Sequence, residues 1–196
     1  MSTKPGDGEA SASPSSSFRG SRRRAGTWPS EDASTPQQRR RNATEVVLRM
    51  LTARERSEAE VRRALSKRGY DPDTIAVVVQ EFISKNLLSD ARFAEAFAEE
   101  AAQRRGYGAA AIRFKLRGKG VSPELAARAA AVSPEDEEER ARELAAKKVR
   151  AMTALSPDVR YRRLAGALAR RGYPADIVSR VAADLSRHEP RAPGDE

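Results

Sequence analysis

The stretch Ile112-Arg-Phe-Lys-Leu116-Arg-Gly-Lys-Gly120-Val121 joins a basic amphipathic helix to a glycine and a closing apolar residue. The same pattern occurs twice more, as Val61-Arg-Arg-Ala-Leu65-Ser-Lys-Arg-Gly69-Tyr70 and Leu164-Ala-Gly-Ala-Leu168-Ala-Arg-Arg-Gly172-Tyr173. The first apolar residues of the three copies are 51 and 52 residues apart. Such a fixed spacing is typical of a tandem helical array, in which no unit can bury its apolar face alone. The repeat therefore predicts helical modules that stack on one another.

Signals for helix ends surround each copy. Ser57-Glu-Ala-Glu60 reads as a capping box, in which the Ser hydroxyl accepts from the third helical amide and the Glu reaches back to the Ser amide. Gly69, Gly120 and Gly172 stand where a helix ends in a left-handed residue, a conformation that is open to Gly. Further helix starts pair a capping side chain with a Pro in the first turn: Asp71-Pro72, Ser122-Pro123, Ser133-Pro134 and Ser156-Pro157.

Between these signals, the apolar periodicity predicts nine helices and almost no strand. The fold class is therefore all-α, a tandem array of three three-helix modules that we expect to be elongated and curved. The module boundaries are 42–88, 89–132 and 133–186. The expected helices are 44–53, 57–68 and 72–84 in the first module, 90–104, 108–118 and 123–131 in the second, and 135–153, 157–170 and 174–186 in the third.

The two ends of the chain differ in composition from the modules. Residues 1–41 are rich in Ser, Pro, Gly and Arg, with almost no aliphatic side chains and with Trp28 as the exception. Such a segment cannot offset the entropy of ordering, so we expect a disordered basic tail. Its clusters Arg22–Arg24 and Arg39–Arg41 either solvate the tail or form a non-specific nucleic-acid arm. Residues 187–196 contain two Pro and are expected to be disordered too.

The chain is basic, with 37 Lys and Arg against 28 Asp and Glu and a formal net charge of +9. This balance favours nucleic acid, an acidic protein or a nucleoprotein assembly as a partner, without choosing between them. One acidic run interrupts it, Ser133-Pro-Glu-Asp-Glu-Glu-Glu139. That run predicts either the solvated first turn of a helix or an acidic patch.

The residue inventory excludes several kinds of site. There is no Cys and the only His is His188, so Cys/His metal clusters, Cys nucleophiles and Ser-His pairs are absent from the body of the chain. No Gly-rich phosphate loop and no convergent acid–base pair is present, so we expect no enzyme and no cofactor. The N-terminus lacks the apolar core of a secretory signal, and no apolar stretch could span a bilayer. We therefore expect a cytoplasmic protein without a membrane contact.

Basic residues concentrate on the middle helix of each module. Around the apolar seam of Ile112 and Leu116, one flank carries two arginines and the other two lysines. Such a face is often only a solvated surface, but its recurrence at the repeat spacing favours contact with a repetitive polymer, a nucleic-acid backbone or a protein filament. The candidate partner-binding residues are Arg62, Arg63, Lys67, Arg68, Arg113, Lys115, Arg117, Lys119, Arg163, Arg170 and Arg171, with Arg160 on the same strip.

Two features of the repeat concern nucleic-acid bases. Tyrosines 70, 107 and 173 lie next to glycines, where they could stack on bases. Val121 at the equivalent place cannot stack, which favours packing of Tyr70 and Tyr173 against their own modules. The helix that would read the major groove in a helix-turn-helix, Thr74–Phe82, is mostly apolar, which indicates a core helix instead.

The order of these motifs resembles that of the bacterial regulatory protein RecX family, over roughly residues 42–185. One departure is Asn86-Leu87-Leu88-Ser89-Asp90, where the family usually has Gly-Tyr-Leu-Asp-Asp. Asn can still adopt the left-handed turn and Ser can still cap the helix. The third module matches more loosely. The matching segments are Arg56-Ser-Glu-Ala-Glu-Val-Arg-Arg-Ala-Leu-Ser-Lys-Arg-Gly69-Tyr70, Ile75–Phe82, Leu87-Leu-Ser-Asp-Ala-Arg-Phe-Ala94, Gly106-Tyr-Gly108 and Lys119-Gly120-Val121.

The resemblance implies a non-enzymatic regulator that binds the RecA recombinase filament on DNA and lies along its groove. It further implies inhibition of filament extension, ATP hydrolysis and strand exchange, and thereby modulation of DNA repair, recombination and the SOS response. A basic, repeated surface fits such a groove and gains avidity as further modules dock. We expect the chain to be a monomer. Single-stranded or double-stranded DNA is a further candidate partner. The alternative is a general basic nucleic-acid-binding helical protein without a recombinase partner.

Overall fold

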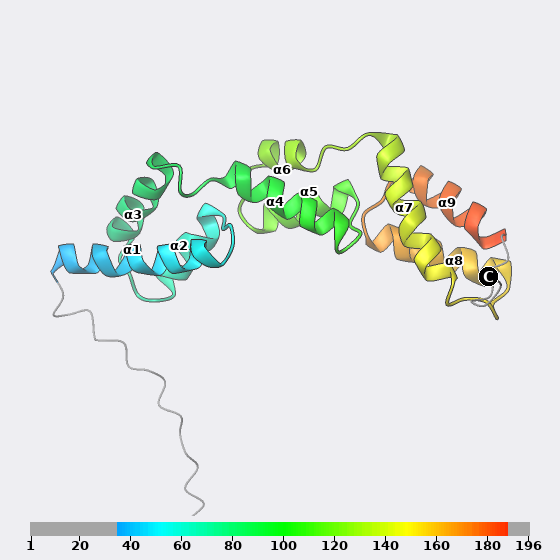
Figure 1. Ribbon diagram of the computed structural model, residues 1–196, viewed down its shortest axis with the longest axis horizontal. Helices are drawn as coiled ribbons and strands as arrows, with labels where there is room; N and C mark the ends of the chain where they lie inside the picture. Colours follow the sequence, from blue (N-terminus) through cyan, green and yellow to red (C-terminus); the bar gives the residue numbers. More distant parts are fainter. Residues whose placement is uncertain (1–34, 188–196) are drawn as a thin grey trace, which may run out of the picture. The chain divides into compact units, whose positions relative to one another are not determined.

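The computed structural model describes residues 35–187, and this part of the chain forms nine helices and no strand (Figure 1). The all-α fold class and the three three-helix modules predicted from the repeat are confirmed. Each module takes three consecutive helices, and two of the nine ranges match the prediction at both ends. The helices are α1 Pro36–Ala53, α2 Glu58–Ser66, α3 Pro72–Ser84, α4 Asp90–Gln103, α5 Ala109–Gly118, α6 Pro123–Ala129, α7 Pro134–Val149, α8 Pro157–Arg170 and α9 Ala175–Arg187.

The first helix begins earlier than predicted. We expected it near residue 44 and assigned residues up to 41 to a disordered tail, but α1 starts at Pro36. Thr35 caps it by accepting a 3.2 Å hydrogen bond from the Gln38 N–H, and Pro36 fits the first turn. The three arginines 39–41 are good helix formers, which extends the helix beyond its apolar stripe. The rest of the predicted tail, including Trp28, and residues 188–196 lie outside the described residues.

Helix starts follow the predicted capping residues. The side chains of Ser57, Asp71, Ser122 and Ser133 each accept a hydrogen bond from an amide in the first turn of the helix that follows. Ser156 stands at the cap of α8 but its side chain accepts no such bond. The second half of the capping box is not formed as predicted, because the Glu60 carboxylate bonds the Lys119 ammonium at 2.7 Å instead.

The three repeated glycines end their helices as predicted. Gly69, Gly120 and Gly172 have φ angles of 86°, 89° and 81°. In each case the next residue donates its N–H to the carbonyl five residues earlier, so that Tyr70 bonds Leu65, Val121 bonds Leu116 and Tyr173 bonds Leu168. Tyr70 packs on the core of the first module and Tyr173 is buried in that of the third. Both tyrosines therefore pack against their own modules, as the comparison with Val121 predicted.

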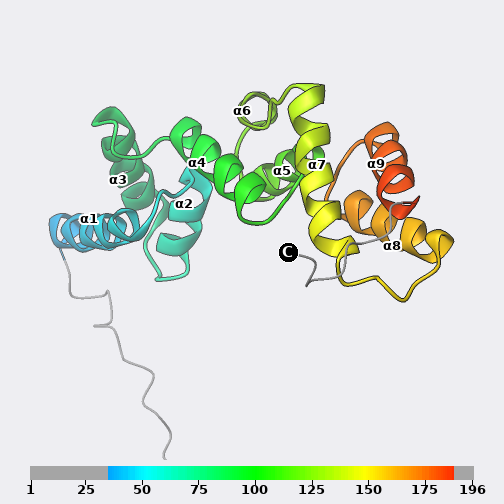
Figure 2. The ribbon, with the colours of Figure 1, turned by 45° about the vertical axis from the view of Figure 1, so that its right-hand side comes forward.

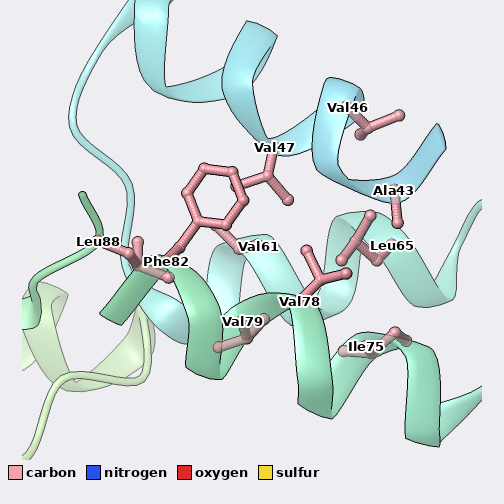
Figure 3. Packing of buried hydrophobic residues seen from close by; sticks show 10 residues of the cluster. All are labelled: Ala43, Val46, Val47, Val61, Leu65, Ile75, Val78, Val79, Phe82 and Leu88. Carbon is pink, nitrogen blue, oxygen red and sulfur yellow. The ribbon is translucent and has the colours of Figure 1, made fainter. Parts of the chain in front are cut away.

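Each module has a core of its own, built on the predicted seam of its middle helix. In the first module, side chains of α1, α2 and α3 point toward one another, with Phe82 near Val47 and Val61 (Figure 3). In the third, α7, α8 and α9 pack together, which Figure 2 shows from a second side. The seam residues are at most 3% exposed: Val61, Leu65, Ile112, Leu116, Leu164 and Leu168.

Candidate partner-binding surface

The middle helices meet end to end at the first joint, between modules one and two. The Ser57 hydroxyl, at the start of α2, donates a 2.8 Å hydrogen bond to the Lys119 carbonyl at the end of α5. The carboxylate of Asp90, the first residue of α4, accepts a 2.8 Å bond from the Glu58 N–H. Module two thus accepts a bond from the Glu58 N–H, one of the backbone donors that the first turn of α2 leaves without a partner in the helix.

The second joint, between modules two and three, repeats this arrangement. The Gly108 N–H, at the start of α5, donates a 2.9 Å bond to the Arg171 carbonyl at the end of α8. The carboxylate of Glu137 on α7 accepts a 2.8 Å bond from the Ala109 N–H. A carbonyl and a carboxylate from the following module therefore meet the positive end of the middle helix at both joints, an arrangement that the helix dipole favours.

The repeated glycines allow this close approach. A Cβ at Gly172 would lie 2.5 Å from the Ala111 backbone nitrogen, and one at Gly120 would collide with the Cβ of Ala59. Gly is therefore required twice over at each joint, for its positive φ and for the missing side chain. The third middle helix begins with Pro157, which has no N–H, so α8 lacks the donor that α2 and α5 use.

Two of the predicted partner-binding residues are engaged in the first joint. The Lys119 ammonium bonds Glu60 and lies 5.4 Å from the ring centroid of Phe97. Burial raises the pKa of Glu60, but Lys119 and Arg54 together hold that pKa below its ordinary value. Arg63 donates to the Lys119 carbonyl at 3.3 Å. Lys119 and Arg63 thus connect modules, a role that the helical wheel did not reveal.

Two more are engaged at the second joint. The Lys115 ammonium lies 4.6 Å and the Arg171 guanidinium 4.9 Å from the ring centroid of Tyr107. Burial raises the pKa of the Tyr107 hydroxyl, but the two cations lower it by more, so that the pKa lies below its ordinary value. Cation–π contacts of this kind stabilise the pairs by about 0.5–2 kcal/mol. The Tyr107 ring is thus in contact with cations of its own chain.

The other predicted cations stay on the surface, with one correction. Arg160 is only 6% exposed and belongs to the interior of the third module, because α8 starts a turn earlier than the repeat requires. The Arg62 guanidinium lies 3.9 Å from the Glu58 carboxylate. The Arg68 guanidinium donates a hydrogen bond to the carbonyl of Ala64. Six of the predicted cations are exposed and form no ion pair with a carboxylate within residues 35–187: Lys67, Arg68, Arg113, Arg117, Arg163 and Arg170.

One exposed aromatic residue on α5 was missed from the sequence. Phe114 is 70% exposed and lies on the helix face shared by Arg113 and Arg117. Gly118 follows it by one turn, and a Cβ there would touch nothing within 4 Å. The signal was available, since position 114 falls outside the seam of Ile112 and Leu116. We call Arg113, Phe114, Arg117 and Gly118 the outer face of α5.

Within the described part of the chain, two other kinds of site are missing. No group of three or more His, Asp or Glu side chains could hold a metal ion. No described helix combines the length and apolarity that crossing a membrane requires.

Comparison with known protein families gives matches along all three modules. Models of the first, second and third three-helix domains of RecX match residues 43–82, 89–129 and 135–182. The proteins named Regulatory protein RecX include one from Amycolatopsis mediterranei, 35% identical over 74% of this chain and 84% of its own. Another, from Streptomyces coelicolor, is 39% identical over 71% of this chain and 74% of its own.

A solved structure shares the fold. The crystal structure of RecX from Lactobacillus salivarius superimposes with a TM-score of 0.68 at 20% sequence identity. The match covers 76% of this chain and 97% of that one. The three-module arrangement is therefore common to both proteins.

Proposed function

Because the chain belongs to the RecX family of regulatory proteins, we propose that it binds the RecA recombinase filament on DNA. It follows the groove of that filament and inhibits filament extension, ATP hydrolysis and strand exchange. In this role it regulates DNA repair, recombination and the SOS response without catalysing a reaction. Its relatives are named regulatory proteins, which supports a regulatory over a catalytic role.

The outer face of α5 is the observation that carries this proposal. Phe114 is 70% exposed, and Arg113 and Arg117 beside it form no ion pair with the described residues. Aromatic and Arg side chains of this kind are enriched at the centres of protein interfaces, where they supply most of the binding energy. Arg113 and Arg117 add attraction toward an acidic protein surface or DNA phosphates.

The repeat supplies further contacts at a fixed spacing. Lys67, which caps the C-terminus of α2, and Arg163 and Arg170 on α8 are exposed cations of the other two modules. The hydrogen-bonded joints hold successive middle helices end to end, which suits a partner whose own surface repeats. Once one module has docked, the others bind at a high effective concentration, so that weak contacts add up to a tight complex.

The proposal is tested by comparing binding to preassembled RecA filaments with binding to naked single-stranded DNA. We expect the labelled chain to bind the filament more tightly and to inhibit its ATP hydrolysis at ratios well below one chain per recombinase. Equal affinity for both, with ATP hydrolysis unchanged, would instead identify a general nucleic-acid-binding protein.

A further inference from the structure

A cationic cavity lies at the second joint, beside the contacts that hold modules two and three together. Its volume is about 710 Å³, and its walls come from the α4–α5 connection, from α7 and from the end of α8. Leu144 and the buried Tyr173 form apolar parts of the wall. This volume is in the range of small-molecule sites, about 300–1,000 Å³.

The charge of the wall distinguishes this cavity from an ordinary apolar pocket. Five cations face a single carboxylate, Glu143. Among the described residues, Arg105 pairs with Glu100 at 3.1 Å, whereas the other arginines and the lysine of the wall form no ion pair. A cleft lined by one sign of charge concentrates its field and attracts ions of the opposite sign. The five cations are Arg104, Arg105, Arg140, Lys147 and Arg171.

We infer that this cavity binds the phosphate groups of a nucleotide, either free or as part of a nucleic-acid strand. Because Glu100 pairs with Arg105, the other four cations against Glu143 leave an excess of three positive charges. Such a charge suits a compact ligand with several negative charges, which a nucleoside polyphosphate or successive phosphodiesters provide. Guanidinium groups suit phosphate oxygens because their planar fork donates two parallel hydrogen bonds. The inference does not depend on the recombinase partner, and its test leaves recombinase out.

The test uses the full chain and two probes, ATP followed by calorimetry and a labelled oligothymidylate followed by fluorescence anisotropy. The variant is R140A/K147A, which removes two exposed cations of α7 without touching the core. The control is R128A/R150A, which removes the same charge at exposed positions outside the cavity. We expect R140A/K147A to weaken binding of at least one probe by about tenfold, and the control to weaken it by less than about twofold.

The two probes distinguish the two sources of phosphate. A free nucleotide site binds ATP, and R140A/K147A weakens that binding by about tenfold. A strand site binds the oligonucleotide, and the slope of log affinity against log salt falls by about 1.4 when two phosphate contacts are lost. If R140A/K147A and R128A/R150A lose the same amount of binding affinity, the cavity acts only through general surface charge, and the inference is overturned. The inference also fails if neither probe binds, or if polyglutamate displaces the bound probe better than tripolyphosphate does.

Discussion

The Glu137 carboxylate accepts a 2.8 Å hydrogen bond from the backbone N–H of Ala109, the first residue of α5. Glu137 belongs to the third module and is only 9% exposed, whereas Ala109 belongs to the second. The bond therefore places a buried negative charge at the positive end of a neighbouring helix. At the first joint the equivalent bond runs from the backbone N–H of Glu58 to the carboxylate of Asp90.

Replacing Glu137 tests the energetic importance of this joint. E137A leaves the Ala109 N–H without its partner in a buried setting and should lower the free energy of unfolding by about 1–3 kcal/mol. E137Q keeps an acceptor oxygen, so it should lower the free energy of unfolding by less than E137A does. Chemical denaturation of both variants measures the difference, with E139A, on the exposed side of the same helix, as control. Equal stability of E137A and E139A would mean that the joint does not stabilise the array.

Two glycines provide a matched pair of substitutions. G172A places a methyl group 2.5 Å from the Ala111 backbone nitrogen at a residue with positive φ, and should destabilise the chain by at least about 2 kcal/mol. G118A adds a methyl group in open space on α5 and should stabilise it by about 0.5–1 kcal/mol. Thermal unfolding distinguishes the two directly. A G172A protein as stable as the parent would contradict the close packing of α8 on α5.

The ion pair between Glu60 and Lys119 makes stability depend on pH. Because the pKa of Glu60 is lowered in the folded chain, the unfolded chain binds more protons as the solution is acidified. The stabilisation is therefore complete well above about pH 4.3, the pKa of an unfolded Glu, and is lost as the pH falls through the lower folded value. E60Q should destabilise by about 1 kcal/mol at neutral pH. A deficit in E60Q that is the same at neutral pH and at about pH 3 would contradict this origin.

Neighbouring positions on α5 should behave in opposite ways. Leu116 is fully buried, so L116A should destabilise the second module by about 2–5 kcal/mol. Phe114 is largely exposed, so F114A should change the free energy of unfolding by less than about 0.5 kcal/mol while weakening binding to the recombinase filament. Denaturation and filament binding, measured side by side, check both. A strongly destabilised F114A would mean that its ring packs against the chain.

Local patterns explain why much of the fold could be predicted. The seam of Ile112 and Leu116, the cap at Asp71 and the glycine at the end of each middle helix depend on neighbours within a few residues, so the sequence displays them directly. The early start of α1 was missed because its first turns carry arginines instead of an apolar stripe.

The joints depend on residues far apart in the chain and could not be predicted in this way. Ser57 and Lys119 are 62 positions apart, and Glu137 stands in an acidic run that we expected to be either solvated or an acidic patch. Lys119 looked like a surface cation because a helical wheel shows only its own helix, not the Glu60 carboxylate of the preceding module. The outer face of α5, by contrast, could have been predicted from the sequence, because Phe114 does not lie on the seam of Ile112 and Leu116.

The most direct test of the proposed function is ATP hydrolysis by RecA filaments on single-stranded DNA in the presence of R113E/R117E. Both arginines are exposed on the outer face of α5, so the variant should keep its helicity and melting temperature. The matched control R128E/R150E reverses two exposed arginines elsewhere and should inhibit like the parent. We predict that R113E/R117E fails to inhibit at concentrations where the parent chain acts, and that its remaining binding depends less on salt. Normal inhibition by R113E/R117E would contradict the proposal and show that this face is only a solvated surface.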